Sequence, residues 1–226
     1  MISISPIRGI PEVRQGDDLA ALIVRAAGAG AIVAGDVVVV AQKAVSKAEG
    51  RVVETAAKTE TAIAESHRIL RRSGDMVISE TPHGFVCANA GVDASNVEPG
   101  HLVLLPLDPD LSARRLRARL RVLCDVDVAV VISDTFGRPW RIGQTDVAIG
   151  VAGLEPFIDY RGRSDSYGNE LQATQICVAD ELAGAAELAM GKTNGVCAAI
   201  VRGATTTTGR GSAKAIVRPP REDLFR

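Results

Sequence analysis

The sequence predicts an α+β fold, that is, a mixed α/β architecture built on a mixed sheet. Continuous apolar runs rich in β-branched residues, such as 36–43 and 126–134, are typical of strands buried on both faces. Apolar residues at helical spacing mark other stretches, for example 109–123. Because these two kinds of segment do not alternate strictly, a mixed sheet is favoured over a doubly wound one. We expect a single domain spanning 1–226, or two subdomains whose boundary the sequence does not indicate.

The N-terminal half is expected to contain strands and helices separated by glycine turns. Asp17 and Asp18 cap a helix that ends at Gly28. The strand that opens at Asp36 leads into AVSKAEGR, a polar stretch that we expect to be a loop. The expected elements, in order, are a strand at 2–5, a loop at 8–11, a helix from 17 to about 27, a strand at 36–43, a helix at 59–72 and a hairpin at 76–91 that turns at His83-Gly84.

The C-terminal half is expected to supply the longest helices and the most apolar strand. Leu116, Leu120 and Leu123 recur at helical spacing, which places them on one helix face. The run VDVAVVISD is the strongest signal for a buried strand in the sequence. The expected elements, in order, are a strand at 101–107, a helix at 109–123, strands at 126–134 and 146–153, a helix at 176–190, a strand at 196–203 and a Thr/Gly-rich loop at 204–212.

The composition argues against several classes of protein. Surfaces that follow nucleic-acid phosphates usually show a basic excess, whereas the formal net charge here is −1, so we expect no nucleic-acid partner. Four cysteines lie far apart without a CxxC pair, which suits reduced thiols better than a disulfide framework or a zinc site. No stretch approaches the ~20 apolar residues of a membrane helix, and the N-terminus has no signal-peptide core. We therefore expect a cytoplasmic protein without a membrane partner.

The first candidate site follows the apolar strand at 126–134. Asp134 lies where this strand meets a loop, so its carboxylate would be held rigidly and could still reach a ligand. The carboxylate of Asp134 and the hydroxyl of Thr135 are hard oxygen ligands, suited to Mg²⁺ or Mn²⁺. The alternative is that Asp134 caps a turn in the FGRP segment that follows.

A dense polar loop comes directly after this site. Within ten residues the chain places Gly137, Arg138, Trp140, Arg141, Gly143, Gln144 and Asp146. The fork-shaped guanidinium groups of Arg138 and Arg141 match carboxylate and phosphate geometry, which indicates a phosphorylated substrate. The alternative is that both arginines are solvated or pair with neighbouring acids.

The segment GVDASN at 91–96 is the second candidate site. Asp93 is a candidate metal ligand, and Asn96 is a candidate reader of a base or ribose. Asx residues beside glycine are also ordinary turn formers, so a turn is the alternative. A divalent ion bound to nucleotide phosphates typically uses one or two carboxylates, so we expect Asp93 and Asp134 to meet at a shared ion.

The third candidate site lies at the end of the strand at 36–43. Lys47 could neutralise a phosphate and Gln42 could read a purine edge, while a merely solvated lysine is the alternative. The sequence contains neither a GxxxxGK[ST] loop nor a GxGxxG motif, so a nucleotide would be bound without a standard phosphate-cradling loop. The segment TTTTGRGSAK is either an anion-binding loop or a flexible connection.

Seven segments, taken together, resemble a known family. In order along the chain they are GIPEVRQGDDL, GDVVVVAQKAVSKAEGR, ANAGVDASNV, VVISDTFGRPWRIGQTDVAIGVAG, YGNELQAT, VADELAGAAEL and REDLF. The sequence resembles the coenzyme F420-0:L-glutamate ligase (F420-0:gamma-glutamyl ligase) family, including the N-terminal ligase domain of its bifunctional actinobacterial members. The resemblance covers nearly the whole chain.

This resemblance implies a GTP-dependent acid–amino-acid ligase. Such an enzyme adds L-glutamate to coenzyme F420-0 through an acyl phosphate and forms gamma-glutamyl F420 species. The implied cofactor is Mn²⁺ or Mg²⁺, with a monovalent cation as a further candidate, and the implied assembly is an intertwined homodimer. The positions that match the family's metal ligands are Asp93, Asp134 and Thr135. The positions that match its guanine-nucleotide contacts are Ile10, Pro11, Glu12, Val13, Gln42, Lys47 and Asn96.

Chemical reasoning adds catalytic roles to these matches. Lys47 is expected to assist at the phosphates. Arg138 and Arg141 are expected to hold the phosphodiester of the precursor or the incoming glutamate.

Two departures from the family pattern affect these expectations. Archaeal members often carry an acidic or amide residue in the C-terminal glycine-rich loop, where it helps hold a second metal, but no carboxylate lies between Arg202 and Lys214. A flavin-binding C-terminal domain is missing from the 226 residues, so no reductase step is expected of them. The alternative functions are an amide ligase for a different acidic acceptor, a non-catalytic nucleotide-binding subunit, and an RNA-binding protein that uses the arginines of 109–123.

Overall fold

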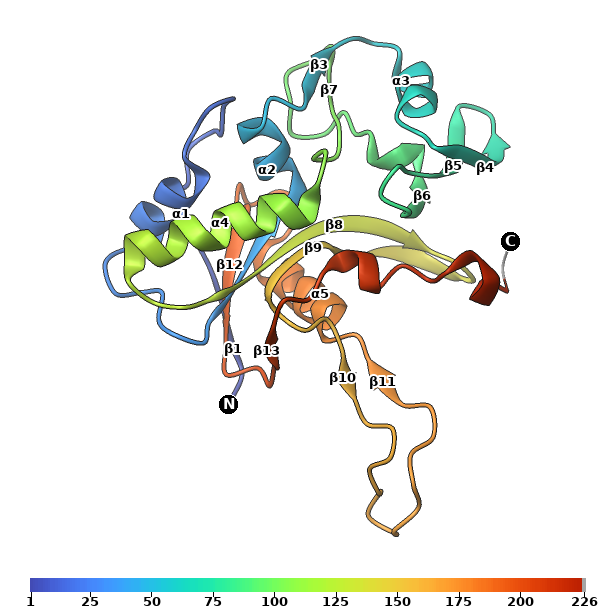
Figure 1. The fold of residues 1–226 in the computed structure, drawn as a ribbon. Helices are drawn as coiled ribbons and strands as arrows, with labels where there is room; N and C mark the ends of the chain where they lie inside the picture. The colour runs from blue at the N-terminus through green and yellow to red at the C-terminus, as the bar shows by residue number, and fades with distance from the viewer. Residues whose placement is uncertain (225–226) are drawn as a thin grey trace.

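A six-stranded sheet forms the centre of the computed structural model, which describes residues 1–224 (Figure 1). Its strands, in spatial order, are β1 (Ser3–Pro6), β12 (Ala198–Arg202), β2 (Val37–Ala41), β8 (Ala129–Arg138), β9 (Arg141–Leu154) and β13 (Thr208–Gly209). β2 and β8 are parallel and the other neighbouring pairs are antiparallel, which confirms the predicted mixed sheet. The REDLF segment ends at Phe225, which lies outside the described residues.

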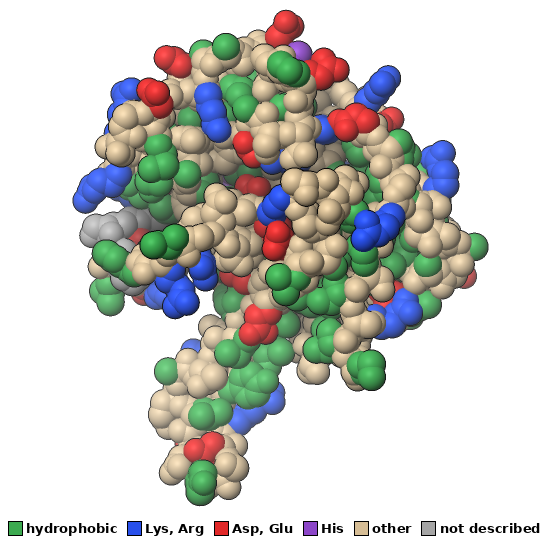
Figure 2. Space-filling view, turned by 180° about the vertical axis from the view of Figure 1, so that it is seen from behind, with side chains coloured by type: hydrophobic (Ala, Val, Ile, Leu, Met, Phe, Trp, Pro, Cys, Tyr) green, Lys and Arg blue, Asp and Glu red, His purple; other side chains and the backbone are tan. Residues whose placement is uncertain are grey.

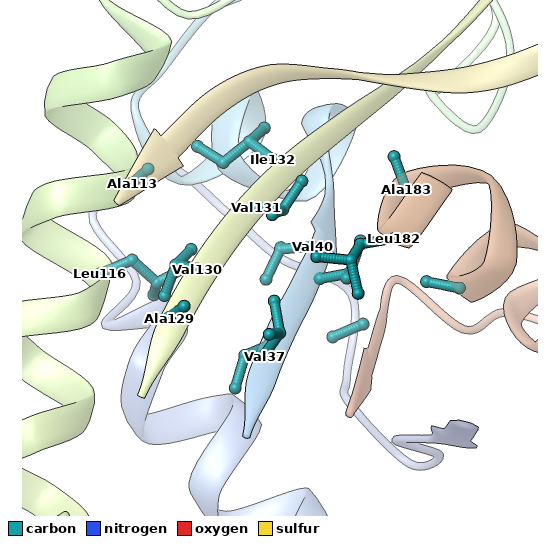
Figure 3. Packing of buried hydrophobic residues seen from close by; sticks show 14 of the residues in the cluster. Val37, Val40, Ala113, Leu116, Ala129, Val130, Val131, Ile132, Leu182 and Ala183 are labelled. Carbon is teal, nitrogen blue, oxygen red and sulfur yellow. The ribbon is translucent and has the colours of Figure 1, made fainter. Parts of the chain in front are cut away.

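Helices cover both faces of this sheet. The three long helices are α1 (Leu19–Ala27), α4 (Pro109–Cys124) and α5 (Val178–Met190). The side chains of 37–40 are at most 1% exposed, so these central strand residues need apolar cover on both faces. Ala113 and Leu116 of α4 provide it on one side, and Leu182 and Ala183 of α5 provide it on the other (Figure 3). None of the helices in the described residues is long and apolar enough to cross a bilayer.

Smaller elements pack above one end of the central sheet (Figure 1). They are α2 (Gln42–Ala48), β3 (Val52–Glu54), α3 (Lys58–Ala64), β4 (Arg68–Ser73), β5 (Met76–Glu80), β6 (Val86–Ala88), the 3-10 helix η1 (Asn89–Gly91) and β7 (His101–Val103). β3 pairs with β7, and β4, β5 and β6 form a three-stranded antiparallel sheet. A second hydrophobic cluster joins these pieces and contains Ala62, Val77, Val92, Leu102 and Leu104.

Two of the predicted elements are wrong, and so is the polar loop predicted at 137–146, which is the end of the hairpin formed by β8 and β9. The predicted helix at 59–72 ends at Ala64, and Arg68–Ser73 is strand β4 instead. Gly74 has a φ of 58° and turns the chain so that β4 pairs with β5, a tertiary pairing that overrides the local helical pattern. The predicted loop AVSKAEGR is mostly helix α2, because Ala44 and Val45 form a buried apolar face that the charged neighbours conceal in the sequence.

A hairpin arm projects from the body of the molecule (Figures 1 and 2). Its base consists of β10 (Ile158–Asp159) paired with β11 (Gln175–Ile176). Beyond this base the arm is held by backbone hydrogen bonds, and the guanidinium of Arg163 lies 5.2 Å from the ring centroid of Tyr160. The sequence pattern did not predict this arm. Two short 3-10 helices, η2 (Ala213–Ala215) and η3 (Pro220–Glu222), complete the described chain.

The register of the parallel pair positions the candidate site. Ala41, the last residue of β2, pairs with Ser133, and the chain then turns directly into α2. β8 continues to Arg138, so its residues beyond Ser133 pair only with β9. The end of β8 therefore has a free edge, which faces α2 and the smaller elements.

Candidate functional site

Two adjacent pockets lie beside the free edge of β8. Their volumes are about 200 Å³ for the first and 390 Å³ for the second, so together they reach the size of a small-molecule site. The first pocket extends to segment 10–13 and α2, and the second extends to β6 and η1. The residues that line both pockets are Lys43, Asn96, Asp134, Thr135 and Lys192.

The structure brings most of the sequence-predicted residues to these pockets. The first pocket is lined, among others, by Ile10, Pro11, Glu12, Val13, Gln42, Lys47, Asn96, Asp134 and Thr135. The second pocket adds Asp93 to the shared residues. These residues come from the N-terminal loop, α2, the loop before β7, and β8. The folded topology therefore joins four segments that are far apart in the sequence.

Successive side chains of β8 face opposite sides of the strand. Ser133 and Thr135 face Asp146 on β9, and both of their hydroxyls donate hydrogen bonds to its carboxylate, at 2.9 and 2.6 Å. Asp134 lies between them and faces the side that carries Lys43 and Asp93. Asp134 and Thr135, which were predicted to bind the same metal, therefore face the pockets from opposite sides of β8.

The carboxylate of Asp134 is half-buried and makes no side-chain hydrogen bond or salt bridge within the described chain. Burial, helped by the nearby carboxylates of Asp146 and Asp93, raises the pKa of Asp134 to about 7, although the amide of Thr135 and the charge of Lys43 act in the opposite direction. Because no side chain of the described residues is bound to it, the carboxylate of Asp134 can bind a cation or a hydrogen-bond donor of a ligand without first breaking an ion pair.

Asp93 has the opposite electrostatic environment. Burial opposes its ionisation, but hydrogen bonds from Lys43 and Ser95 outweigh burial and lower the pKa of Asp93 to about 2. The ammonium of Lys43 lies 2.6 Å from the Asp93 carboxylate, and that of Lys58 lies 4.0 Å from it. Asp93 is therefore an ionised carboxylate that already carries a counter-charge.

Asp146 is buried and has three hydrogen-bond donors around its carboxylate. Besides the two hydroxyls of β8, the ammonium of Lys192 donates to it at 2.8 Å. Asp146 belongs to the segment predicted as a polar loop but lies in strand β9, and its site role was missed, as were those of Lys43 and Lys192. Lys43 could have been found from its place beside Gln42 and Lys47, whereas GKTNG after the predicted helix 176–190 offers no specific signal for Lys192.

The α2 side of the first pocket contains two predicted nucleotide contacts. Lys47 is ion-paired with Glu12, and both residues line the pocket. Gln42 is 1% exposed, and its amide nitrogen donates to Ser46 at 2.7 Å and to the Leu104 carbonyl at 2.9 Å. Any base recognition by Gln42 therefore has to use its other polar atoms.

Arg138 and Arg141 lie at the exposed turn of the β8–β9 hairpin. The guanidinium of Arg138 donates to the Ile142 carbonyl at 3.1 Å, and Trp140 beside it is 85% exposed. Neither arginine lines the two pockets, although Gly137 of the same hairpin borders the second one. The turn thus follows directly on residues that line the second pocket.

The donor set fits a divalent metal that is held by few protein ligands. No three carboxylate, imidazole or thiol side chains converge among residues 1–224. Asp93 and Asp134 nevertheless line the same pocket, and hard cations that bind nucleotide phosphates usually keep water and phosphate oxygens as their remaining ligands. Burial and Asp134 raise the pKa of the nearby Cys87 to about 12, so its thiol is a poor ligand.

Comparisons with known proteins show the family of this chain. The model of the F420-0:Gamma-glutamyl ligase family matches residues 8–203. A protein of Methanothermobacter thermautotrophicus named Coenzyme F420:L-glutamate ligase is 43% identical over 249 aligned residues, covering 100% of this chain and 99% of the relative. Proteins of the same name from Methanopyrus kandleri and Archaeoglobus fulgidus are 43% and 40% identical, each covering 100% of this chain and 98% and 96% of their own lengths. The chain belongs to the F420-0:gamma-glutamyl ligase family.

Proposed function

We propose that this chain is a GTP-dependent ligase that joins L-glutamate to coenzyme F420-0 and forms gamma-glutamyl F420 species. The observation that carries the proposal is the convergence of Asp93, Asp134 and Lys47 on two adjoining pockets. The description of the family supports F420-0 as the acceptor, and the name of the relatives supports L-glutamate as the amino acid. The first pocket would take the nucleotide and the second would take the acceptor.

The proposed reaction has two steps. An oxygen of the acceptor's terminal carboxylate attacks the γ-phosphorus of GTP, the bond to the β–γ bridging oxygen breaks, and GDP leaves. The amine of glutamate then attacks the carbonyl carbon of the acyl phosphate, phosphate leaves, and the amine loses a proton as the amide forms. Such phosphoryl transfer asks the protein mainly to position reactants and neutralise charge.

The lysines of α2 supply fixed positive charge for this chemistry. Lys47 and Lys43 are each paired with a carboxylate at the pocket wall, Glu12 and Asp93 respectively. Phosphate oxygens could replace these carboxylates as acceptors, so that Lys47 holds the nucleotide phosphates. Segment 10–13, Gln42 and Asn96 would contact the guanosine part of the ligand.

Asp93 and Asp134 would hold the divalent cation, with Thr135 at the wall common to both pockets. When bound, Mn²⁺ or Mg²⁺ would add positive charge beside the transferred phosphoryl group. The carboxylates of Asp93 and Asp134 and the hydroxyl of Thr135 match the hard oxygen ligands that both ions prefer.

Arg138 and Arg141 are proposed to recognise the anionic groups of the acceptor or of glutamate. Their position on the exposed hairpin turn beside the second pocket supports this role. The exposed ring of Trp140 on the same turn offers a flat apolar surface to the acceptor.

We also propose that two copies of the chain form an intertwined homodimer. The hairpin arm supports this proposal, because its residues are mostly exposed and it projects from the body that would otherwise cover it (Figure 2). Ile158 at its base packs against the main core, and a hairpin that is mostly exposed beyond such a base is a natural element for exchange between copies.

The direct test is to incubate the protein with coenzyme F420-0, L-glutamate, GTP and Mn²⁺ and to follow the acceptor by mass spectrometry. The proposal predicts the mass increase of one or more glutamyl residues, with GDP and phosphate as co-products. ATP in place of GTP should give much less product. Persistent F420-0 alongside GTP turnover on another acid would instead indicate a ligase for a different acidic acceptor.

A further inference from the structure

Lys192 reaches the candidate site from the turn that ends α5. Gly191 terminates the helix with a φ of 63°, and the side-chain amide of Asn194 donates to the Met190 carbonyl at 3.1 Å. This turn directs Lys192 back across the ends of β8 and β9. Its side chain lines both pockets.

The ammonium of Lys192 joins two groups of the pocket wall. It donates to the carboxylate of Asp146 at 2.8 Å and to the hydroxyl of Thr135 at 2.6 Å, and Glu187 lies 3.6 Å away. The Asp146 side chain is 3% exposed, whereas that of Lys192 is 53% exposed. The pair thus connects a buried charge with the pocket, unlike an ion pair between two solvated surface groups.

These contacts restrict the hydroxyl of Thr135. A threonine hydroxyl has one hydrogen to donate and two lone pairs to accept with. The hydrogen goes to Asp146 at 2.6 Å, and one lone pair accepts the ammonium of Lys192. One lone pair is left, on an oxygen that lines both pockets.

We propose that Lys192 is a positioning residue of the ligase, an inference that rests on the proposed function. Together with Asp146 it holds the Thr135 hydroxyl in one orientation, so that the remaining lone pair is presented to the divalent cation. Lys192 acts through Thr135 and touches no reacting atom. A lysine whose task was only to stabilise the fold would leave metal binding unchanged.

The test compares Lys192→Met with Lys192→Arg, Thr135→Val and the double variant Thr135→Val/Lys192→Met. Mn²⁺ binding is measured by electron paramagnetic resonance in the presence of a non-hydrolysable GTP analogue, alongside kcat, KM for GTP and Tm. Arg121→Met serves as the matched control, because it removes an exposed cation from the surface of α4.

Loss of a residue that orients a metal ligand typically costs 10–100-fold in metal affinity or activity. We therefore expect Lys192→Met to weaken Mn²⁺ binding about 10-fold or more while KM for GTP changes less than about threefold. Lys192→Arg, which keeps the positive charge, should bind Mn²⁺ more tightly than Lys192→Met. The double variant should bind Mn²⁺ about as well as whichever single variant binds it more weakly. The reason is that both substitutions abolish the same interaction, one by removing the hydroxyl and the other by removing the group that orients it.

Unchanged Mn²⁺ affinity in Lys192→Met, or losses that simply add in the double variant, would overturn the positioning role while leaving the ligase proposal intact. If Lys192→Met fails to fold, Lys192→Gln takes its place, because it keeps a hydrogen-bond donor without the charge. Weaker Mn²⁺ binding would then support the positioning role, and unchanged Mn²⁺ binding would overturn it. Absence of Mn²⁺ binding in the wild-type chain would instead remove the proposed metal and, with it, this inference.

Discussion

Asp134 and Asp146 lie on neighbouring strands of one hairpin and line one pocket, yet their surroundings are opposite. Asp146 is buried and accepts hydrogen bonds from two hydroxyls and an ammonium. Asp134 has no side-chain partner within the described chain, and burial together with neighbouring carboxylates raises its pKa to about 7. The first carboxylate is satisfied by donors of its own chain, and the second has no side-chain donor where a ligand can reach it.

The register of the strands produces this difference. Thr135 pairs with Asp146 across the ladder, so the hydroxyls of Ser133 and Thr135 face that carboxylate. Asp134 faces the opposite side of β8, toward Lys43 and Asp93. The alternation of side chains along β8 therefore supplies Asp146 with two donors and leaves Asp134 without a side-chain donor.

Asp134→Asn should have the largest effect on activity. The change removes an anionic cation ligand and almost no volume, so turnover should fall about 10²- to 10³-fold. Steady-state assays at limiting Mn²⁺ measure the effect, and Asp75→Asn at an exposed turn is the control. Near-normal turnover of the purified variant would mean that Asp134 binds no metal.

Asp146→Asn should mainly reduce stability. It leaves the ammonium of Lys192 without its buried counter-charge and disturbs both hydroxyl contacts, so the free energy of unfolding should drop by about 3 kcal/mol. Urea denaturation in EDTA measures this loss. If Asp134→Asn proved the more destabilising of the two substitutions, the assignment of structural and functional roles would be reversed.

The pH dependence of the free energy of unfolding should test the environment of Asp134. The pKa of Asp134 in the folded chain is raised to about 7 from 3.8, so folding favours its protonated form. The stabilisation that comes from this preference is fully present below pH ~4 and is lost as the pH rises through ~7. The full shift corresponds to about 4 kcal/mol, and solvent screening of the half-buried carboxylate should reduce it to about half. In EDTA at pH 8, Asp134→Asn should therefore be more stable than the wild-type chain by about 2 kcal/mol, a gap that closes toward pH 4. A pH-independent difference in unfolding free energy would contradict the unpaired state of Asp134.

Lys47→Ala should have the smallest of these effects. Its ammonium is expected to contact the nucleotide phosphates, so KM for GTP should rise about 10-fold while KM for glutamate changes less than about twofold. Initial rates at varied GTP and glutamate measure both constants. Equal increases would indicate that Lys47 does not discriminate between the two substrates.

The sequence predicts the central sheet well because its strands are strongly apolar. The runs at 36–43 and 126–134 contain β2 and most of β8, and the leucine spacing predicts α4. Strand β4 and helix α2 were missed because each depends on tertiary packing that the local pattern does not reveal.

The site was predictable where side-chain chemistry and family motifs coincide. Asp93, Asp134 and Lys47 belong to segments that the resemblance singles out, and all three line the pockets. Lys192 stands alone in an ordinary turn, and only the folded chain places it beside Thr135 and Asp146. Which carboxylate is satisfied also depends on strand register, which composition and spacing do not specify.

The central claim is that Asp93 and Asp134 together bind one cation beside the nucleotide. The most direct measurement is Mn²⁺ titration, followed by electron paramagnetic resonance, of the wild-type chain, Asp93→Asn and Asp134→Asn with a non-hydrolysable GTP analogue. We predict tight Mn²⁺ binding in the wild-type chain and a loss of at least about 10-fold in each variant. Equal Mn²⁺ affinity in all three proteins would contradict the shared cation site.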